Sequence, residues 1–389
     1  MYKKLKYNVK IHYDEINSKW DKFIANVPNI HFEQLSVWKE FNDPKLKSFY
    51  IYLCEEEDII VGSKIYFWEY PFVGKVGFLL RGPVFHNFNE KWLALFFKEL
   101  KVYIQKSNFI YLVVNLPDFR KRSIENDIKL NMSRVGFARN KKKIPPDYYL
   151  KCTLLLDLSL SVDNIWKGVT KSRRRNIKKG LNLKYVFREG ERKEVKIFYN
   201  LMREMGYRRN TNISPNNVAV FLNLWDNYYE KGYFKLFVLE YDNEIICAMT
   251  SFTMGEVFRW WKWGWNGKYK SIHLPSLLIW ETIMWAKSNG FKQYDFVNLN
   301  CNVAYKTLNN IKLEKLEELE YSTGPTLFKI RFGGQFIQYP DAFIIFKNKY
   351  IELVVDYLYN KVVGFVFYNF IKVIKFILSL LRKYAIKGK

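Results

Sequence analysis

The densest cluster of chemically useful side chains is the basic run Lys171–Lys179, which reads KSRRRNIKK. In a helix, side chains four residues apart lie on one stripe, so Arg174 aligns with Lys178 and Arg175 with Lys179. Such a stripe neutralises phosphates, and arginine can clamp them with paired hydrogen bonds. We therefore predict a polyanion contact, against the alternative of a solvated helix face that repels itself. The predicted contact residues are Arg173, Arg174, Arg175, Lys178 and Lys179.

A second unusual segment is the predicted strand Arg259–Trp265, which reads RWWKWGW. Strand alternation predicts that Trp261, Trp263 and Trp265 share one face and that Trp260 lies on the other. A wall of indole rings can stack on a base or a sugar. Burial of both faces of the sheet explains the same pattern equally well, so both interpretations stay open.

Side chains for metal or nucleophile chemistry are scarce. The four cysteines lie far apart without a CxxC pair, and the four histidines share no ligand spacing. A zinc site, a dense disulfide framework and a Ser-His-Asp triad are therefore not expected. The phosphate-binding loops GxxxxGKS, GxxxxGKT and GxGxxG do not occur in the sequence either. We predict no metal and no bound cofactor.

Composition points to an anionic partner. The 389-residue chain carries 63 Lys and Arg against 38 Asp and Glu, which gives a net charge of +25. Nucleic acid, anionic phospholipid or a phosphate-rich substrate fits this charge, and a basic bias from an AT-rich genome is the alternative. Hydrophobic residues make up 49% of the chain, which allows packed cores. The N-terminal segment lacks the apolar run of a signal peptide, so we expect a reducing cytoplasm.

The predicted strands and helices that position these residues follow the same order in the two halves of the chain. In the first half, helices are predicted over residues 17–25 and 33–41, strands over 48–53, 59–68 and 74–81, a helix over 90–106 and a strand over 109–115. In the second half, strands are predicted over 233–240, 244–253 and 257–265, a helix over 275–288 and a strand over 294–299. A phrase also repeats, Lys-Ser-Asn followed by an apolar strand that ends in Val-Asn-Leu. The matching order predicts two copies of one mixed α/β domain.

The joint between the copies is predicted in the polar, proline-broken segment Lys141–Asp147. The predicted domains are residues 1–150 and 151–345, followed by a C-terminal amphipathic helix over residues 346–389. Residues 349–389 contain eight Lys or Arg against two acidic residues, and Lys372 and Lys375 interrupt the apolar stretch 362–381. That pattern is typical of an interfacial helix rather than of a span. We predict attraction to an anionic membrane surface on the inner face, with a helix packed on the core as the alternative.

Several short motifs occur in a fixed order along the chain. They are Gln34-x-Ser36-x-Trp38, Arg81-Gly82-Pro83-Val84, Thr153 to Leu158, Phe198-Tyr199 with Arg208, Pro275 to Leu278, Tyr294-Asp295-Phe296, and Phe328-Lys329-x-x-Phe332-Gly333-Gly334. In this order they resemble the motifs of the FemABX-type aminoacyl transferases, which are built of two acetyltransferase-like (GNAT) domains. The resemblance implies an α/β (α+β) fold of two tandem GNAT-like acyltransferase domains, followed here by the amphipathic helix.

The resemblance also implies transfer of an amino acid from aminoacyl-tRNA to an amine of a lipid-linked or nucleotide-linked peptidoglycan precursor. Because the ester of aminoacyl-tRNA is already activated, the site must chiefly position the amine and stabilise an oxyanion. Lys329 is the predicted catalytic residue, and a surface lysine at a strand end is the alternative. Arg208 and Arg331 can hold substrate phosphates or serve as structural ion-pair partners. The predicted substrate-binding residues are Lys39, Arg208, Tyr269 and Arg331, and the five cations of the basic run become the predicted tRNA contacts.

Two other functions stay open at this point. An N-acyltransferase would act on an amino sugar in surface polysaccharide synthesis, with an acyl-CoA donor. Residues 268–275, where such enzymes hold the pyrophosphate of acetyl-CoA, contain no paired-glycine loop, which disfavours this donor. The non-enzyme alternative is a basic RNA- or membrane-binding protein that has lost its chemistry, and the retained motif around Lys329 weighs against it.

Overall fold

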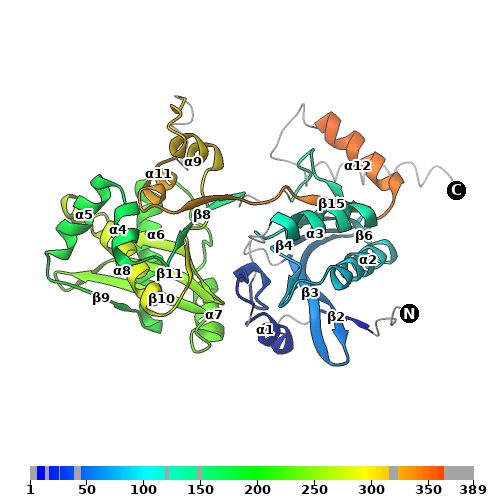
Figure 1. The fold of residues 1–389 in the computed structure, drawn as a ribbon, viewed down its shortest axis with the longest axis horizontal. Coiled ribbons are helices and arrows are strands. Elements are labelled where there is room, and N and C mark those ends of the chain that lie inside the picture. Colours follow the sequence, from blue (N-terminus) through cyan, green and yellow to red (C-terminus); the bar gives the residue numbers. More distant parts are fainter. Residues whose placement is uncertain are drawn as a thin grey trace. The chain divides into compact units, whose positions relative to one another are not determined.

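The structure is a computed structural model that describes residues 7–13, 17–25, 27–38, 45–118, 122–146, 151–314 and 323–362. The chain divides into two compact units, each built on one mixed β-sheet (Figure 1). The first unit comprises Met1–Glu15, Pro44–Tyr148 and Asp341–Lys389, and the second comprises Ile16–Asp43 and Tyr149–Pro340. These units differ from the predicted domains, because residues 16–43 group with the second unit and residues 341–345 with the first.

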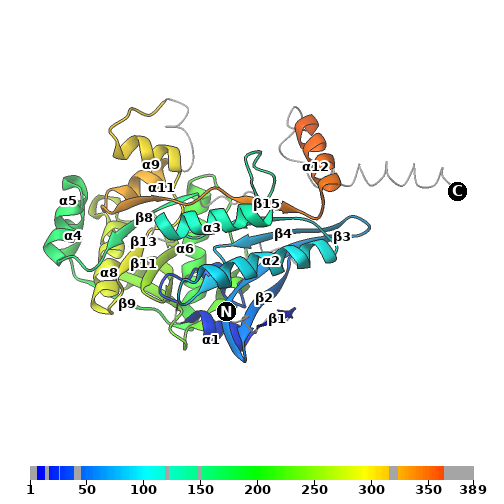
Figure 2. The ribbon, with the colours of Figure 1, turned by 45° about the vertical axis from the view of Figure 1, so that its right-hand side comes forward.

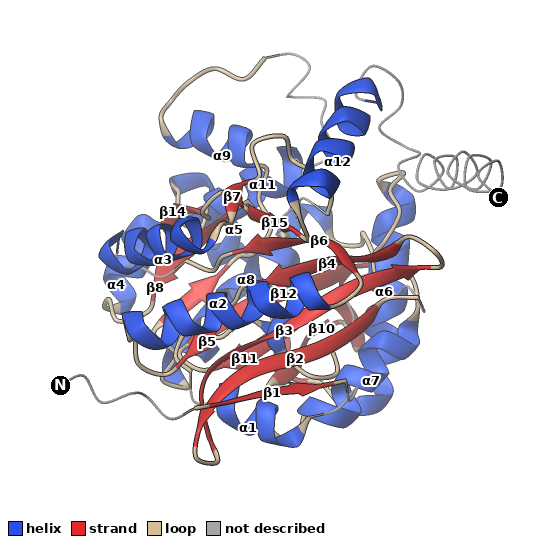
Figure 3. Ribbon diagram, turned by 90° about the vertical axis from the view of Figure 1, so that its right-hand side faces the viewer, coloured by secondary structure: helices blue, strands red, loops and turns tan. Residues whose placement is uncertain are grey.

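The first unit is an eight-stranded sheet. Its strands are β1 (Asn8–His12), β2 (Lys47–Glu55), β3 (Asp58–Tyr70), β4 (Gly74–Leu80), β5 (Val84–Phe85), β6 (Phe109–Asn115), β7 (Ala138–Arg139) and β15 (Phe343–Phe346). They run in the order β1-β2-β3-β4-β6-β15-β7, and β5 pairs with β3. Helices α2 (Glu90–Lys106) and α3 (Arg122–Val135) pack together over one face of this sheet (Figure 3). Helix α12 (Lys349–Val362) follows β15.

The second unit is a seven-stranded sheet in the order β14-β8-β13-β12-β11-β10-β9. Its strands are β8 (Cys152–Asp157), β9 (Tyr185–Glu189), β10 (Phe234–Tyr241), β11 (Glu244–Met254), β12 (Val257–Trp265), β13 (Gln293–Asp295) and β14 (Gln335–Gln338). Its helices are α1 (Ser18–Ala25), α4 (Val162–Gly168), α5 (Lys171–Leu181), α6 (Val195–Arg208), α7 (Val218–Tyr228), α8 (Leu274–Ser288), α9 (Cys301–Leu308) and α11 (Thr323–Ile330). Helix α5 packs beside α8 (Figure 2), and α6 packs on β12.

The predicted duplication is present. In the first unit, the antiparallel strands β2, β3 and β4 lead into α2, and β6 returns parallel to β4. In the second unit, the antiparallel strands β10, β11 and β12 lead into α8, and β13 returns parallel to β12. This repeat confirms the prediction of two tandem GNAT-like domains. The helices begin where local chemistry favours it: the Asn89 side chain caps α2, and Pro275 occupies the first turn of α8.

Three predicted elements differ from the structure. The strand predicted over residues 294–299 ends at Asp295, because its neighbours β8 and β12 pair with β13 only over Gln293–Asp295. The helix predicted over 33–41 is a single 3-10 turn, Phe32–Gln34, within the described part of that segment. The alternation predicted for the tryptophan strand is wrong. A β-bulge lies opposite Thr250 and Ser251, so Trp260 and Trp263 lie against each other and against Phe328, while Trp261 packs on Phe32 and Phe221.

The C-terminal prediction falls mostly on residues outside the description. Helix α12 is described to Val362, and residues 363–389, which include Lys372 and Lys375, lie beyond the described part of the chain. Within the residues that are described, no helix is both long and apolar enough to cross a membrane.

Candidate active site

Lys329 lies in the last turn of α11, so the alternative of a lysine at a strand end does not hold. Its Nζ donates hydrogen bonds to the carbonyl oxygens of Val297, at 2.5 Å, and Asn298, at 3.1 Å. The same nitrogen lies 5.0 Å from the centre of the Trp260 ring. The FKxxFGG motif continues through Gly333 and Gly334, whose positive φ angles let the chain pass close to Gly168 and Leu155. The amine is therefore fixed in direction by two acceptors.

The two carbonyls come from an unusual stretch of backbone. Val297 and Asn298 have φ angles of 42° and 54°, in the left-handed region that non-glycine residues seldom adopt. The Val297 N–H donates to Asp295 Oδ1 at 2.9 Å, and the Asn300 N–H donates to Thr326 Oγ1 at 2.9 Å. This turn presents two successive carbonyl oxygens to one amine, which an extended strand does not do because its successive carbonyls point in opposite directions.

Asp295 anchors the start of that turn from the core of the sheet. The carboxylate is 2% exposed and accepts a hydrogen bond from Thr153 Oγ1 on β8. Its Oδ2 lies 3.4 Å from Nε of Arg259, which is also buried. A buried carboxylate must be paired and hydrogen-bonded, so these contacts hold Asp295 in one position.

Burial lowers the pKa of Lys329 to about 7. The negative charge of Asp295 opposes this change, and the positive charge of Lys262 adds to it. Protonated and neutral forms of the amine are therefore both populated near neutral pH. A lysine with this property beside a cavity is a candidate for catalysis.

Two cavities share Lys329 in their walls. One, of about 450 Å³, is lined by Arg209, Trp260, Trp263, Gly324, Pro325, Phe328 and Lys329. The rings of Trp263 and Phe328 are stacked within it, 5.6 Å apart. The other, of about 580 Å³, extends along α6 and shares Arg209, Trp263, Pro325 and Lys329 with the first. None of the described residues that line either cavity is acidic, so the surroundings of the amine favour anionic or neutral substrates.

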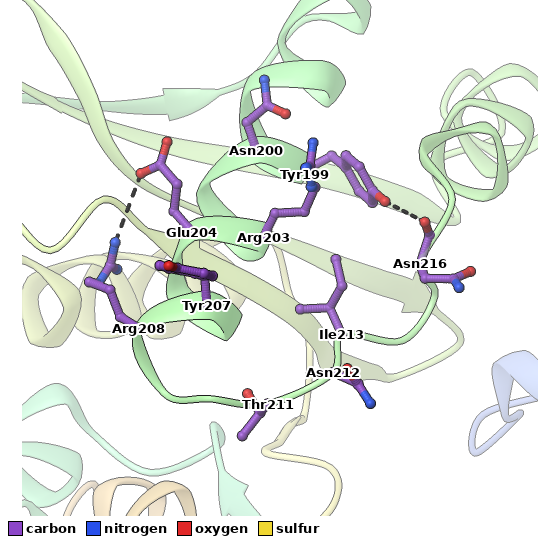
Figure 4. A pocket seen from close by; sticks show the side chains of 10 residues that line it. All are labelled: Tyr199, Asn200, Arg203, Glu204, Tyr207, Arg208, Thr211, Asn212, Ile213 and Asn216. Atoms are coloured by element: carbon purple, nitrogen blue, oxygen red, sulfur yellow. Dashed lines mark hydrogen bonds and ion pairs between the residues drawn. The ribbon is translucent and has the colours of Figure 1, made fainter.

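A third cavity, of about 1010 Å³, shares the lining residues Thr211, Asn212 and Ile213 with the second. Figure 4 shows its polar lining from α6 and from the segment that follows this helix. Arg208 is at its edge. Arg208 donates to the carbonyls of Trp265 and Asn266 and lies 3.9 Å from Glu204. Arg208 therefore holds the loop after β12, which fits the structural alternative, and it also contributes charge to the cavity.

The basic run forms α5, but its cations differ in exposure. Arg173 is only 4% exposed, and its guanidinium lies 4.2 Å from the centre of the Phe328 ring and donates to Ser276 Oγ on α8. Burial, with the charge of Arg331, lowers the pKa of Arg173 to about 10. Arg174 donates to the carbonyls of Trp166, Lys167 and Val169 at the end of α4. Arg173 is therefore buried inside the unit, which does not fit the predicted phosphate contact. Arg174 is only half-buried and donates through one guanidinium nitrogen, so its predicted phosphate contact stays a prediction.

Arg175, Lys178 and Lys179 are exposed on the outer face of α5. Beside them, His273 immediately precedes α8, and burial together with the charges of Lys179, Arg173 and Arg175 lowers its pKa. Three exposed cations thus remain from the predicted stripe. Of these, Arg175 and Lys179 act on His273 at the beginning of α8, where backbone N–H groups favour anions.

The remaining predicted substrate residues have separate outcomes. The hydroxyl of Tyr269 donates to Asp242 Oδ2 at 2.9 Å, which ties the loop before α8 to the turn between β10 and β11. Arg331 is exposed, and its carbonyl accepts the Thr170 N–H that precedes α5. Lys39 lies outside the described residues. The structure does not bring Tyr269 or Arg331 into the lining of the cavities at Lys329. Within the described part of the chain, no group of three or more His, Cys, Asp or Glu is arranged to hold a metal ion.

Comparison with known proteins gives this fold and site a family. Residues 16–245, more than half of the chain, match the FemAB family. The chain belongs to the FemAB family. No curated protein matches the sequence. Membership in the FemAB family makes the chain an acyltransferase, and it supports aminoacyl transfer in cell-envelope synthesis as the class of reaction.

The solved structure of FemX supports the fold of this FemAB-family protein. It is similar to FemX, with a TM-score of 0.72 and 14% identity over 90% of this chain and 100% of FemX. It also matches L-PGS from Bacillus licheniformis, with a TM-score of 0.45, 13% identity and coverage of 77% of this chain and 85% of that one. A tandem GNAT protein from the clavulanic acid biosynthesis pathway matches with a TM-score of 0.45, 7% identity and coverage of 88% and 99%.

Sequence reasoning missed the groups that surround Lys329. Asp295 is part of the Tyr294-Asp295-Phe296 motif, and a carboxylate inside an apolar strand is a signal that it has a buried partner. The carbonyls of Val297 and Asn298 leave no such signal, because any residue supplies a carbonyl oxygen. Arg209 follows Arg208 directly, and the sequence does not show which of the two lines the cavities at Lys329. That depends on where α6 ends, and the structure places Arg209 in their lining.

Proposed function

We propose that this FemAB-family protein transfers an amino acid from aminoacyl-tRNA to an amine of a lipid-linked or nucleotide-linked cell-envelope precursor. The observation that carries the proposal is Lys329, an amine held by two carbonyls at the wall that two cavities share. Two adjoining cavities that share one cationic group offer a place for each substrate of an acyl transfer.

In the proposed reaction, the acceptor amine attacks the ester carbonyl of aminoacyl-tRNA. A C–N bond forms and the ester C–O bond breaks, while the proton lost by the amine ends on the released ribose oxygen. The ammonium of Lys329 stabilises the oxyanion that forms on the carbonyl. Two of its three N–H groups are taken by Val297 and Asn298, so the third is already directed when the substrate binds.

The donor is proposed to lie along α5. Arg175, Lys178 and Lys179 supply exposed charge for the phosphates of tRNA. Arg173 stacks on Phe328, the residue before Lys329, and so joins α5 to the helix that carries the amine. A tRNA end held on α5 would therefore rest on the same rigid scaffold as Lys329.

The acceptor is proposed to occupy the cavities along α6. The second and third cavities share Thr211, Asn212 and Ile213, so a long molecule can extend from Lys329 past this segment. Arg203 and Arg208 line the third cavity, Lys262 lines the second, and Arg209 lines the second beside Lys329. These cations suit the phosphates of a lipid-linked or nucleotide-linked precursor.

A membrane contact is proposed for α12. Tyr350, Leu353, Val354 and Tyr357 fall on one helical stripe and are exposed, Tyr350 by 75%. The sequence that follows is apolar and cationic, which matches an anionic lipid surface. The double variant Leu353→Glu with Tyr357→Glu should sediment less with anionic vesicles than the unchanged protein while its melting temperature stays the same. Equal sedimentation of both proteins would contradict the membrane contact.

The identity of the acyl donor distinguishes the proposed aminoacyl transfer from the two alternative functions. Labelled aminoacyl-tRNA and labelled acyl-CoA should be offered separately with lipid-linked precursors, nucleotide-linked precursors and amino sugars. We expect label from aminoacyl-tRNA on an envelope precursor and none from acyl-CoA. Transfer from acyl-CoA alone would overturn the proposal in favour of the amino-sugar N-acyltransferase. RNA binding without transfer from either donor would support the protein that has lost its chemistry.

A further inference from the structure

One pair of cysteines is bonded in this structure. Cys152 and Cys301 form a disulfide although 149 residues separate them, and their Cα atoms lie 5.7 Å apart. Cys152 begins β8 and is buried, whereas Cys301 begins α9 and is partly accessible. The other two cysteines, Cys54 and Cys247, are free and buried.

The disulfide lies at one end of the turn that supports Lys329. At the beginning of the turn, Asp295 is held by Thr153, the neighbour of Cys152 on β8. At its end, Cys301 is bonded to Cys152 itself. Val297 and Asn298 lie between these two anchors, in left-handed conformations that persist only when the surrounding structure holds them. The covalent bond is therefore placed where it can maintain the position of both carbonyls.

We propose that Cys152 and Cys301 are a redox-responsive pair that positions Lys329. The disulfide holds the carbonyls of Val297 and Asn298 against the amine, and the dithiol lets them move away. The inference rests on the role proposed above for Lys329 in acyl transfer. The sequence predicts a reducing compartment, where a protein disulfide is characteristically transient and senses the redox state.

The oxidant is a low-molecular-weight disulfide such as glutathione disulfide. The thiolate of Cys301 attacks one sulfur of the oxidant, a mixed disulfide forms and the first glutathione leaves as its thiolate. Cys152 then attacks the sulfur of Cys301, and the second glutathione leaves. Two protein thiols are oxidised, one glutathione disulfide is reduced to two glutathiones, and each departing thiolate takes up a proton. The order follows from exposure, because Cys301 is accessible and lies in the first turn of α9, where backbone N–H groups stabilise negative charge.

The effect on the amine follows from its surroundings. The charge of Asp295 on β13 raises the pKa of Lys329, and the charge of Lys262 on β12 lowers it. Arg209, which follows α6, lines both cavities at the amine, and Arg173 on α5 lies against the ring of the neighbouring residue, Phe328. Burial is the largest cause of its lowered pKa. When the turn loosens, water reaches the amine, and the pKa of Lys329 should rise toward the ordinary lysine value.

The test uses the full chain, oxidised with glutathione disulfide or reduced with dithiothreitol, and peptide mapping confirms the state of the pair. Acetic anhydride labelling of Lys329 across pH, read by mass spectrometry, gives the titration of this amine without any acyl donor. Turnover with the donor established by the transfer assay is measured in parallel. Cys301→Ser and Cys152→Ser remove the pair, and Cys54→Ser and Cys247→Ser are matched controls that leave it intact.

Reduction should move the labelling midpoint of Lys329 upward by at least half a pH unit. It should also lower turnover about fivefold at a pH below 7, where the amine is protonated in both redox states and only its position differs. The Cys301→Ser and Cys152→Ser proteins should show the reduced values in both media, whereas the two controls should respond as the unchanged protein does. A midpoint that stays the same in both confirmed redox states would overturn the inference, as would failure of the pair to form with glutathione disulfide. A midpoint that shifts while no donor is consumed would instead count against the proposed function and leave the positioning effect intact.

Discussion

The tripeptide Val-Asn-Leu occurs at equivalent places in the two units and adopts two different conformations. In the first unit, Val114 and Asn115 complete β6, where Val114 pairs with Leu79 on β4 and with Phe343 on β15. In the second unit, Val297 and Asn298 lie beyond β13 with left-handed φ angles. The same tripeptide therefore lies at the end of a strand in the first unit and in a tight turn in the second.

The neighbours of each tripeptide explain the difference. Strand β6 is paired with β15 up to Val114 and with β4 up to Asn115, and the Asn115 carbonyl accepts the Arg81 N–H that directly follows β4. Strand β13 has partners only to Asp295, and the Asp295 carboxylate then accepts the Val297 N–H and turns the chain. The carbonyls released from the sheet bind Lys329 instead. A duplicated fold can thus acquire a site in one copy by ending one strand early.

The largest effect should come from the amine that uses these carbonyls. Lys329→Met should lower turnover about 10²–10³-fold, as expected for loss of an oxyanion donor, with little change in melting temperature. Lys287 is a matched control, because its Nζ also donates to two carbonyls, those of Leu158 and Leu160, but lines none of the three cavities. Lys287→Met should keep turnover within about threefold. Wild-type turnover in Lys329→Met would show that the turn of the second unit carries no chemistry.

The second comparison concerns surface charge in the two units. Reversing Arg175, Lys178 and Lys179 to Glu should weaken tRNA binding about 10–10²-fold near 0.1 M salt, and should reduce the salt slope by about 0.7–0.9 for each lost phosphate contact. The control reverses Lys98, Lys106 and Lys141, three exposed lysines of the first unit, and changes the net charge equally. Filter binding across salt concentrations measures both proteins. Equal loss in the two would mean that only total charge attracts the RNA, and that α5 has no special role.

The pH dependence of turnover tests which form of Lys329 acts. Oxyanion stabilisation needs the protonated amine, whose pKa is about 7, so turnover should fall about tenfold per pH unit above this value. The contribution of Lys329 to the free energy of unfolding should instead increase with pH. Between pH 7 and 10.5 the unfolded chain holds a proton on this lysine that the folded protein lacks, so its contribution to the free energy of unfolding rises with pH. A turnover that instead rises through pH 7 would identify the neutral amine as a base.

The smallest effect should be the change in unfolding free energy on replacing the two equivalent asparagines, Asn298 and Asn115. Asn298→Val places a β-branched side chain at positive φ and should cost about 1–2 kcal/mol of unfolding free energy. Asn115→Val, at the equivalent place in β6, should change stability by less than about 0.5 kcal/mol, since valine favours strands. Urea denaturation of both variants measures the difference. Equal destabilisation would contradict the distinction drawn between the two tripeptides.

Local sequence was sufficient for much of the architecture. Periodicity and turn residues predicted α2, β6 and β12 with the observed bounds, because apolar spacing and caps act over a few residues. The order of these elements, read twice, predicted the tandem domains. The motif around Lys329 identified the lysine that lies between two cavities, and the density of cations identified α5 as a basic helix.

Tertiary structure alone decided how these parts act. Whether Val-Asn-Leu extends a strand or turns depends on how far the neighbouring strands reach, and this is a long-range property that the tripeptide does not contain. The exposure of each arginine in α5 depends on the helices packed against it, so Arg173 lies on Phe328 while Arg175 faces solvent. Cys152 and Cys301 meet only because β8 and the start of α9 lie side by side. Residue types set which chemistry is available, and the packing of distant segments determines which groups are close enough to perform it.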